Sequence, residues 1–273
     1  MSASTAPAHR LRAETVNGGY GQKTVLERLS LEIPDHAVTT IIGPNGCGKS
    51  TLLHALGRLL PPSSGRVALD GTDLYSLSPK QAARSLGLLP QTPIAPEGMT
   101  VSELVALGRH PYHTWLRPWS VADDDHVRHA LELTAVADLA DRPLESLSGG
   151  QRQRVWLAMT LAQDTDIVLL DEPTTYLDLA HSLDLLDLID DLRGKNGRTV
   201  VMLLHDLVLA TRYSDHLVVM SEGRVAASGH PSEVITESLL EELFGLRARV
   251  IEDPVSDRPL IVPIGRRHAN FTR

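Results

Sequence analysis

An α/β fold with a mostly parallel sheet is predicted by the sequence. Segments of strand and helix character alternate along the 273 residues, which is typical of a parallel sheet covered by helices on both faces. A hydrophobic content of 42% is enough to bury a sizeable core. Four short apolar runs, bounded by polar, Gly or Pro residues, mark the expected core strands: Val38–Ile42, Leu86–Leu89, Ile167–Leu170 and Val200–Leu204.

The residues that follow these four runs are chemically distinctive. Ligands in open α/β sheets bind beyond the carboxyl ends of the strands. Groups at four such ends are therefore expected to converge on one site. The groups are Gly43, Gln91 (after Pro90), Asp171 with Glu172, and His205.

Between the second and third of these strands the pattern changes to helix. The capping box Thr100–Glu103 predicts a helix that runs through Leu107. Ser120–Asp123 predicts a second helix start, with acidic residues in the first turn, where the helix dipole favours them. A third helix is expected over Ala135–Leu139. Residues 92–145 are thus predicted to form a helical insertion in the α/β core.

Composition and charge exclude several classes of protein. The net charge of −8 argues against non-specific nucleic-acid binding, which needs a basic face. The single cysteine, Cys47, cannot form an internal disulfide and fits a reducing compartment. The longest apolar run is far shorter than the ~18 residues of a spanning helix. No apolar stretch follows Met1, so an export signal is not expected. The chain is therefore expected in the cytosol.

Residues 43–51 form a glycine-rich phosphate loop. Gly43, Gly46 and Gly48 permit backbone angles and close approaches that a side chain would block. The loop amides and the following helix N-terminus then face phosphate oxygens. Lys49 is expected to add positive charge at the β and γ phosphates, and the Ser50 hydroxyl is expected to be a Mg²⁺ ligand. The expected nucleotide-binding set is Gly43, Pro44, Asn45, Gly46, Cys47, Gly48, Lys49, Ser50 and Thr51.

The run Ile167–Leu170 ends in two acids that complement this loop. Asp171 is placed to hold Mg²⁺, directly or through water. Glu172 is placed to polarise an attacking water. Next to a phosphate loop, the pair predicts hydrolysis of a nucleoside triphosphate.

Leu147–Gln151 reads Leu-Ser-Gly-Gly-Gln and gives the chain a family resemblance. This segment resembles the signature sequence of ABC transporter nucleotide-binding subunits. Lys49, Ser148 and Asp171 also follow one another in the order found in that family, and the resemblance covers nearly the whole chain. It implies an ABC ATPase fold: a P-loop NTPase core with an N-terminal antiparallel β portion and a helical insertion. The implied division is one domain, 11–263, with a RecA-like core (11–91 and 146–263), a helical subdomain (92–145) and tails at 1–10 and 264–273.

The resemblance also implies roles for individual residues. Gln91 would contact Mg²⁺ and the attacking water, His205 would bind the γ-phosphate and orient Glu172, and Tyr20 would stack on adenine. Ser148 is a good N-cap for a helix over Gln151–Leu161, whose positive end would face a γ-phosphate. In the family, two subunits pair head to tail and each completes the partner's site. The residues that would act in trans are Ser148, Gly149, Gly150, Gln151 and Asp178.

The class of transported molecule is indicated by sequence similarities that are less specific than the ATPase motifs. Gly108–Tyr112, Thr174–Leu179 and Glu242–Gly245 resemble the branch that imports ferric siderophores, haem and cobalamin, and look most like its ferric-siderophore members. Haem and cobalamin remain open. Tyr176 stands where the family more often has a small residue. The implied partners of this peripheral protein at the cytoplasmic face of the membrane are a second copy, a polytopic permease and, indirectly, an extracytoplasmic substrate-binding protein, with no nucleic acid.

Two other classes share parts of these motifs. Chromosome-maintenance and DNA-repair ATPases place long coiled-coil arms between the two halves of the site, and the sequence shows no sustained heptads. Translation-type factors carry two tandem cassettes, whereas this chain has one phosphate loop and one signature. Both classes are therefore disfavoured.

Three further groups of residues have two interpretations each. Lys49 and nearby amides could lower the pKa of Cys47 and make it reactive, or the thiol could point away and be inert. His126 and His129 are better explained by a solvated, acid-capped helix than by a metal site. A last group is either part of an interface with the permease or packed locally. Its members are Arg109, Tyr112, Trp115, Arg117 and Trp119.

Overall fold

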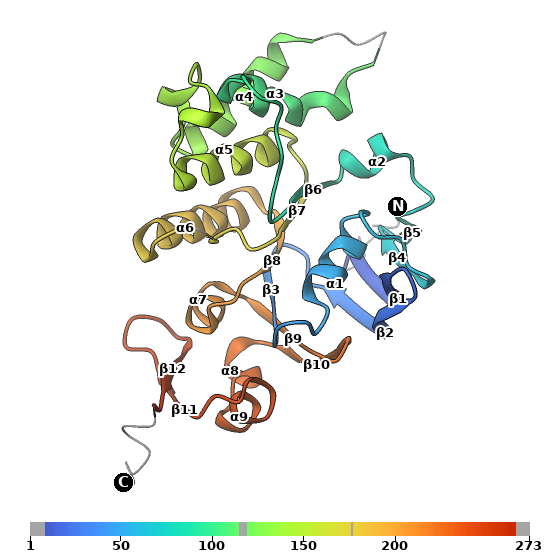
Figure 1. The fold of residues 1–273 in the computed structure, drawn as a ribbon, viewed down its shortest axis with the longest axis vertical. Coiled ribbons are helices and arrows are strands. Elements are labelled where there is room, and N and C mark those ends of the chain that lie inside the picture. Colours follow the sequence, from blue (N-terminus) through green and yellow to red (C-terminus); the bar gives the residue numbers. More distant parts are fainter. Residues whose placement is uncertain (1–8, 115–118, 176, 266–273) are drawn as a thin grey trace, which may run out of the picture. The chain divides into compact units, whose positions relative to one another are not determined.

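The computed structural model describes residues 9–114, 119–175 and 177–265. These residues pack as two compact units: unit 1 comprises the described residues within 1–73 and 203–273, and unit 2 those within 74–202. Figure 1 labels the elements of both. Trp115, Arg117 and Tyr176, which were singled out above, lie outside the described residues, as does most of each tail. The division into a core and a helical subdomain stays a prediction.

Unit 1 contains an antiparallel sheet near the N-terminus, as predicted. Its strands follow the order β2-β1-β4-β5. Their bounds are β1 (Leu11–Tyr20), β2 (Lys23–Ile33), β4 (Ser64–Leu69) and β5 (Thr72–Asp73). Along β1, buried residues such as Leu11, Ala13 and Val16 alternate with more exposed ones, so one face of the sheet packs on apolar neighbours.

The second group of strands in unit 1 carries the phosphate loop. Strand β3 (Val38–Ile42) is buried throughout and pairs in parallel with β9 (His216–Ser221), which pairs antiparallel with β10 (Arg224–Gly229). Helix α1 (Lys49–Leu56) follows β3 through the loop. The remaining elements are α7 (Leu207–Tyr213), α8 (Pro231–Val234), α9 (Glu237–Phe244) and the hairpin β11 (Ala248–Glu252) and β12 (Pro259–Pro263).

Three parallel strands form the core of unit 2. Their order is β8-β7-β6, with bounds β6 (Leu86–Leu89), β7 (Ile167–Leu170) and β8 (Thr199–Leu203), whose last residue belongs to unit 1. The predictions of all four core strands from apolar runs are confirmed. Strands β6 and β7 pair in register from Leu86 and Ile167 onward, so they end at the same edge. The residues that follow them, Gln91 and Glu172, are therefore neighbours in space.

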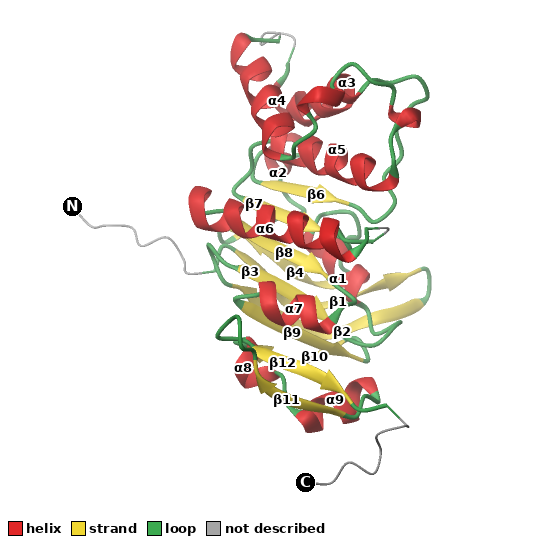
Figure 2. Ribbon diagram, turned by 90° about the vertical axis from the view of Figure 1, so that its left-hand side faces the viewer, coloured by secondary structure: helices red, strands yellow, loops and turns green. Residues whose placement is uncertain are grey.

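Helices make up most of the rest of unit 2. They are α2 (Pro79–Ala83), α3 (Val101–Ala106), η1 (Leu107–Tyr112), α4 (Val121–Leu133), η2 (Ala137–Leu139), η3 (Leu144–Ser146), α5 (Gly149–Ala162) and α6 (Leu179–Asn196). Figure 2 shows α3, α4 and α5 packed together. The helix starts predicted at Thr100 and Ser120 are confirmed, each with its capping box. The third predicted helix is wrong: Ala135 has a φ of 53°, so only the short 3-10 turn η2 forms.

No helix in the described part of the chain is both long and apolar enough to cross a bilayer. The longest, α6, has 18 residues and is interrupted by charges such as Asp184, Asp187 and Asp190.

Candidate functional site

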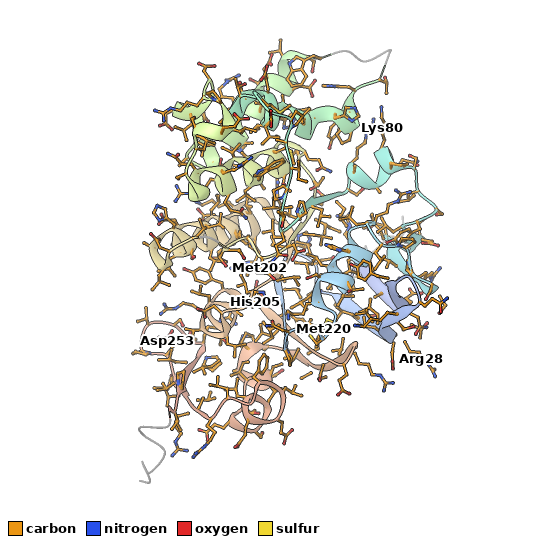
Figure 3. All side chains as sticks on the ribbon, viewed as in Figure 1. Arg28, Lys80, Met202, His205, Met220 and Asp253 are labelled. Carbon is orange, nitrogen blue, oxygen red and sulfur yellow. The ribbon has the colours of Figure 1, made fainter. Side chains whose placement is uncertain are left out.

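The phosphate loop of unit 1 has a backbone that glycine makes possible. Gly43, Gly46 and Gly48 all have positive φ angles, of 152°, 78° and 105°. A Cβ at Gly43 would lie 2.3 Å from the carbonyl oxygen of Met220, whose side chain is labelled in Figure 3. At Gly46 the space is open, so there the requirement comes from the backbone angle alone.

The turn between β9 and β10 supports this loop and was missed from the sequence. The Gly223 amide donates a hydrogen bond to the Cys47 carbonyl, with an N–O distance of 2.9 Å. Glu222 and Gly223 both have positive φ angles, as in the two-residue turns of tight hairpins. The Glu-Gly pair between two apolar runs was the available signal for the turn, but nothing in the sequence placed it under the loop.

Lys49 is buried and bonded to its own loop. Its Nζ donates to the carbonyl oxygens of Gly43 and Pro44, at 2.9 and 3.0 Å. Helix α1, which Lys49 begins, has Gly48 as its N-cap and no side-chain capping bond. The amides at this helix end are therefore available to an anion such as phosphate. Ser50 and Thr51 follow in the first turn of the helix.

Cys47 does not have the lowered pKa that was considered from the sequence. The thiol is 5% exposed, and burial raises its pKa by more than the nearby Lys49 charge lowers it. The interpretation of Cys47 as a thiol with a lowered pKa is therefore corrected, and a thiol with a raised pKa is expected to react slowly.

Tyr20 and His205 are also in unit 1. Tyr20 ends β1 with 52% of its surface exposed, and its hydroxyl lies 3.2 Å from Nδ1 of His54 on α1. His54 was not singled out from the sequence, because the two residues are 34 positions apart. His205 is exposed, two residues after β8 ends (Figure 3), and directly precedes Asp206, the N-cap of α7.

In unit 2, Gln91 and Glu172 are in direct contact. Gln91 Nε2 donates to Glu172 Oε2 at 2.7 Å. Asp171 is 2% exposed, and its amide donates to the Leu89 carbonyl at 2.9 Å, which extends the strand pairing to the acidic pair. Glu172 has a φ of 51°, so the chain turns sharply at this residue.

The signature segment begins α5 with a complete capping box. Gln151 N donates to Ser148 Oγ at 3.3 Å, and Ser148 N donates to Gln151 Oε1 at 3.0 Å. The predicted role of Ser148 as an N-cap is confirmed. A Cβ at Gly149 would meet nothing within 4 Å, so this part of the helix end is uncovered.

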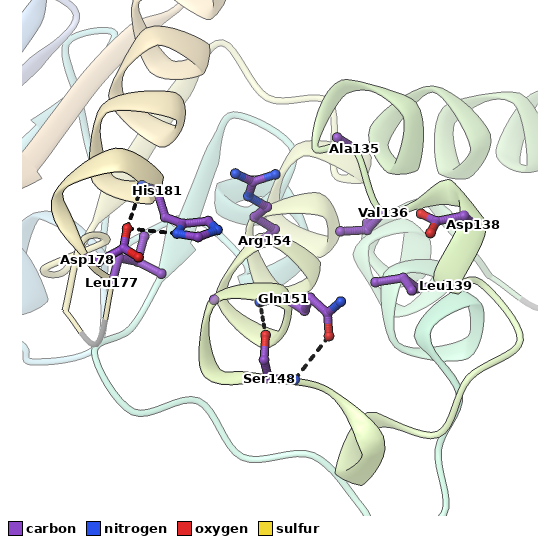
Figure 4. Close-up of a pocket in the computed structure, with 11 residues that line it drawn as sticks. Ala135, Val136, Asp138, Leu139, Ser148, Gln151, Arg154, Leu177, Asp178 and His181 are labelled. Atoms are coloured by element: carbon purple, nitrogen blue, oxygen red, sulfur yellow. Dashed lines mark hydrogen bonds and ion pairs between the residues drawn. The ribbon is translucent and has the colours of Figure 1, made fainter.

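A cavity of about 410 Å³ joins the signature to the start of α6, as Figure 4 shows. Ser148, Gly150, Gln151 and Asp178 contribute to its lining. Asp178 caps α6 by accepting from the His181 amide at 2.9 Å, and the His181 ring lies 2.7 Å from the same oxygen. These two hydrogen bonds hold the pKa of Asp178 below its usual value. All the residues expected to act in trans thus come from one region of unit 2.

Arg109 and Tyr112, considered above as interface residues, pack locally. Arg109 is 3% exposed, and it donates through Nε to Asp123 at 3.0 Å and through Nη1 to the Ala162 carbonyl at 2.9 Å. Tyr112 lies under the guanidinium and donates to the Gln163 carbonyl at 2.9 Å. Burial raises the pKa of Asp123, but hydrogen bonds from Ser120 and Arg109 outweigh it and hold that pKa far below the usual range. Trp119 remains 43% exposed and donates to Asp124.

Comparison with known proteins agrees with this geometry. Residues 26–175 match the family model described as ABC transporter. The ferric enterobactin transport ATP-binding protein FepC of Escherichia coli (strain K12) is 49% identical, covering 96% of this chain and 97% of that protein. The iron(3+)-hydroxamate import ATP-binding protein FhuC of Bacillus subtilis (strain 168) is 45% identical, covering 92% and 93%. The dimeric structure of MJ0796, a bacterial ABC transporter cassette, superposes with a TM-score of 0.73 at 27% identity, covering 81% and 98%.

The chain belongs to the ABC transporter family, and it is an ATPase of that family. The α/β P-loop fold and the resemblance to the ferric-siderophore branch, both predicted from the sequence, are confirmed.

Proposed function

We propose that this chain is the ATP-hydrolysing subunit of an importer for ferric siderophores. It works at the cytoplasmic face of the membrane as a head-to-tail pair bound to a separate permease. The observation that carries the proposal is how the N-termini of α1 in unit 1 and α5 in unit 2 are capped. Helix α1 lacks a side-chain cap and begins with a buried lysine, whereas α5 presents a serine at the rim of a cavity.

ATP binds first to unit 1. Its phosphates accept from the loop amides and from the N-terminal amides of α1, and they replace the carbonyl partners of Lys49. This exchange is favourable because a charged acceptor forms stronger hydrogen bonds with an ammonium group than a carbonyl does. Tyr20 is exposed at the end of β1 and stacks on the adenine.

Mg²⁺ prefers oxygen ligands, and the three residues that we propose to hold it all carry a side-chain oxygen. The Ser50 hydroxyl, the Gln91 amide oxygen and the Asp171 carboxylate would hold the ion. When bound, Mg²⁺ neutralises charge on the β and γ phosphate oxygens.

Hydrolysis depends on Glu172, with Gln91 and His205 as positioning groups. The Glu172 carboxylate accepts a proton from the attacking water, and His205 donates to the γ-phosphate. Catalysis is positioning and charge stabilisation, without a covalent intermediate.

The second copy of the chain supplies its signature segment, Leu147–Gln151, to the nucleotide bound by the first copy. The Ser148 hydroxyl accepts from Gln151 N, and no hydrogen bond that it donates is found within the described residues. Its proton is therefore available to a γ-phosphate oxygen of the partner subunit while the helix cap stays intact. Gly149, Gly150 and Gln151 line the same helix end, and Asp178 borders it. Two equal sites follow from the two-fold arrangement, as expected for a symmetric dimer.

A second cavity in unit 2 is suited to a segment of the permease. It has a volume of about 320 Å³ and is lined by the loop after β6 and by residues from the first half of α5. Pro93, Ile94 and Ala95 give it an apolar rim, and Ile94 is 89% exposed. Because Gln91 belongs to the same loop, movement of a segment bound here would be transmitted to the Glu172 carboxylate.

The choice of cargo rests on the relatives. FepC and FhuC are matched along nearly their whole lengths, and their names specify two chemically different ferric chelates. A ferric siderophore is therefore favoured over cobalamin or haem. An extracytoplasmic binding protein would deliver it to the permease.

The test of the ATPase mechanism is Glu172→Gln. This variant should bind MgATP, fail to hydrolyse it and elute from a sizing column as an ATP-bound dimer. A Glu172→Gln protein that hydrolyses ATP at the parent rate would contradict the mechanism. The cargo is tested separately in cells lacking this chain, which should lose uptake of radioactive iron supplied as a siderophore complex but retain uptake of cobalamin.

A further inference from the structure

One oxygen of the Glu172 carboxylate receives two side-chain hydrogen bonds inside unit 2. Gln91 Nε2 donates to Oε2 at 2.7 Å, and Thr175 Oγ1 donates to the same atom at 3.1 Å. Gln91 was expected near Glu172 from the sequence. Thr175 was not, and neither the proposed nucleotide contacts nor the proposed trans contacts include it.

Thr175 reaches the carboxylate because the chain turns back on itself. The Thr175 amide donates to the Glu172 carbonyl at 3.1 Å, which closes a four-residue turn over Glu172–Thr175. Pro173 occupies the second position, where its fixed φ favours such a turn. Glu172 has a φ of 51°. The turn therefore returns the Thr175 hydroxyl to the side chain of the residue that starts it.

The two donors differ in how firmly they are tied to Glu172. Gln91 follows a different strand, β6, and belongs to the exposed loop that includes Ile94. Thr175 is half-buried and part of the same turn as Glu172, which is 9% exposed. A shift of the loop would remove the Gln91 bond, whereas the Thr175 bond moves with the carboxylate.

We propose that Thr175 is a positioning residue for Glu172. Its hydroxyl holds Oε2 and so fixes the plane of the carboxylate when Gln91 turns to other partners during the ATPase cycle. The inference rests on the proposed function, in which Glu172 accepts the proton of the attacking water. It adds a residue that would act on the rate of the chemical step and not on nucleotide binding.

The test compares Thr175→Val, which keeps the shape and removes the hydroxyl, with Thr175→Ser, which keeps the hydroxyl. Steady-state ATPase of the full chain should show a kcat about tenfold lower for Thr175→Val with KM unchanged. Thr175→Ser should stay within about twofold of the parent kcat, because the donor is retained. Equal losses in both variants, or a parent kcat in Thr175→Val, would overturn the proposal.

A double-mutant cycle with Gln91→Ala sharpens the test. If both donors hold the same oxygen, Thr175→Val should lower kcat by a larger factor in the Gln91→Ala background than in the parent. A smaller factor there would mean that Thr175 depends on Gln91 and does not hold the carboxylate by itself. Should Thr175→Val fail to fold, Thr175→Ala against Thr175→Ser gives the same contrast.

Glu172→Gln separates this proposal from the one on which it rests. If Glu172→Gln loses hydrolysis and Thr175→Val retains it, the positioning role is wrong and the assignment of Glu172 stands. If Glu172→Gln itself hydrolyses ATP normally, the proposed function fails first, whatever Thr175→Val does. A Thr175→Val protein whose affinity for MgATP falls as much as its kcat would indicate a structural role only.

Discussion

The N-termini of α1 in unit 1 and α5 in unit 2 are built in opposite ways. Helix α1 begins after Gly48, has no side-chain cap and begins with Lys49, a cation at the end where the dipole favours anions. Helix α5 has a reciprocal capping box at Ser148 and Gln151. At its other end, Arg109 donates to the carbonyl of its last residue, Ala162.

The difference separates a helix end that requires a ligand from one that does not. Without an anion, the first amides of α1 have no side-chain cap, and the Lys49 ammonium donates to the neutral carbonyl oxygens of Gly43 and Pro44. A phosphate would offer both groups a charged acceptor, so nucleotide binding should stabilise this helix end. The N-terminus of α5 is capped by its own side chains and does not need a ligand. The Ser148 hydroxyl still has a proton to donate. Unit 1 is therefore expected to bind ATP first, and the signature of a partner to add a further contact.

The largest effect is expected at the C-terminal end of α5. Arg109→Leu leaves the buried Asp123 without its guanidinium and removes the bond to Ala162, so the free energy of unfolding should fall by about 3–5 kcal/mol. Denaturant unfolding, followed by the fluorescence of the buried Trp156, measures this. The control is Arg128→Leu, whose pair with Asp125 is exposed and should contribute less than about 1 kcal/mol. Similar losses in both variants would mean that the buried cluster does not support α5.

The next largest effect is expected at the N-terminus of α1, the helix end that requires a ligand. Lys49→Ala should weaken ATP binding about 100-fold, because a charge-assisted contact to phosphate is lost. Equilibrium binding of ATP measures the change, and Lys195→Ala, an exposed residue on α6, is the control. ATP should also raise the unfolding temperature of the parent and not of Lys49→Ala. Parent affinity in Lys49→Ala would show that α1 does not need its lysine for the nucleotide.

A smaller effect distinguishes the two roles of Ser148. Ser148→Ala should lower the free energy of unfolding by about 1 kcal/mol, whereas Ser148→Asp should keep the cap and cost little. Both should prevent the ATP-bound dimer in the Glu172→Gln background, since neither donates to phosphate and Asp adds repulsion. Unfolding and sizing experiments on the same proteins check both points. A stable dimer with Ser148→Asp would argue that Ser148 is a cap and nothing more.

The smallest effect expected is the alkylation of Cys47. Burial raises the pKa of this thiol, so less thiolate forms at neutral pH than in an exposed cysteine, and iodoacetamide should react slowly. The rate should rise with pH through a pKa above the ordinary value and increase strongly on unfolding. Reaction as fast as that of a cysteine in an unfolded peptide at pH 7 would contradict the buried thiol.

The sequence predicted those parts of the molecule that depend on local patterns. Apolar runs marked the core strands β3, β6, β7 and β8, and side-chain caps marked the starts of α3, α4 and α5. The third helix failed because nothing in an alanine indicates a left-handed backbone at Ala135. The sequence left two interpretations of Cys47 open, because the burial that raises the pKa of its thiol cannot be read from the loop residues alone. The hydroxyl of Thr175 reaches Glu172 only through the geometry of a turn, which the letters Glu-Pro-Thr-Thr suggest but do not place.

The most direct test of the account mixes two defective chains, Lys49→Ala and Ser148→Arg, both also carrying Glu172→Gln. Each variant alone should bind no trapped ATP and remain monomeric. If the signature acts in trans, the mixed dimer contains one site with a parent phosphate loop and a parent signature, so it should trap one ATP for every two chains. If mixing restores neither a dimer nor trapped ATP, the site is not shared between subunits and the account is wrong.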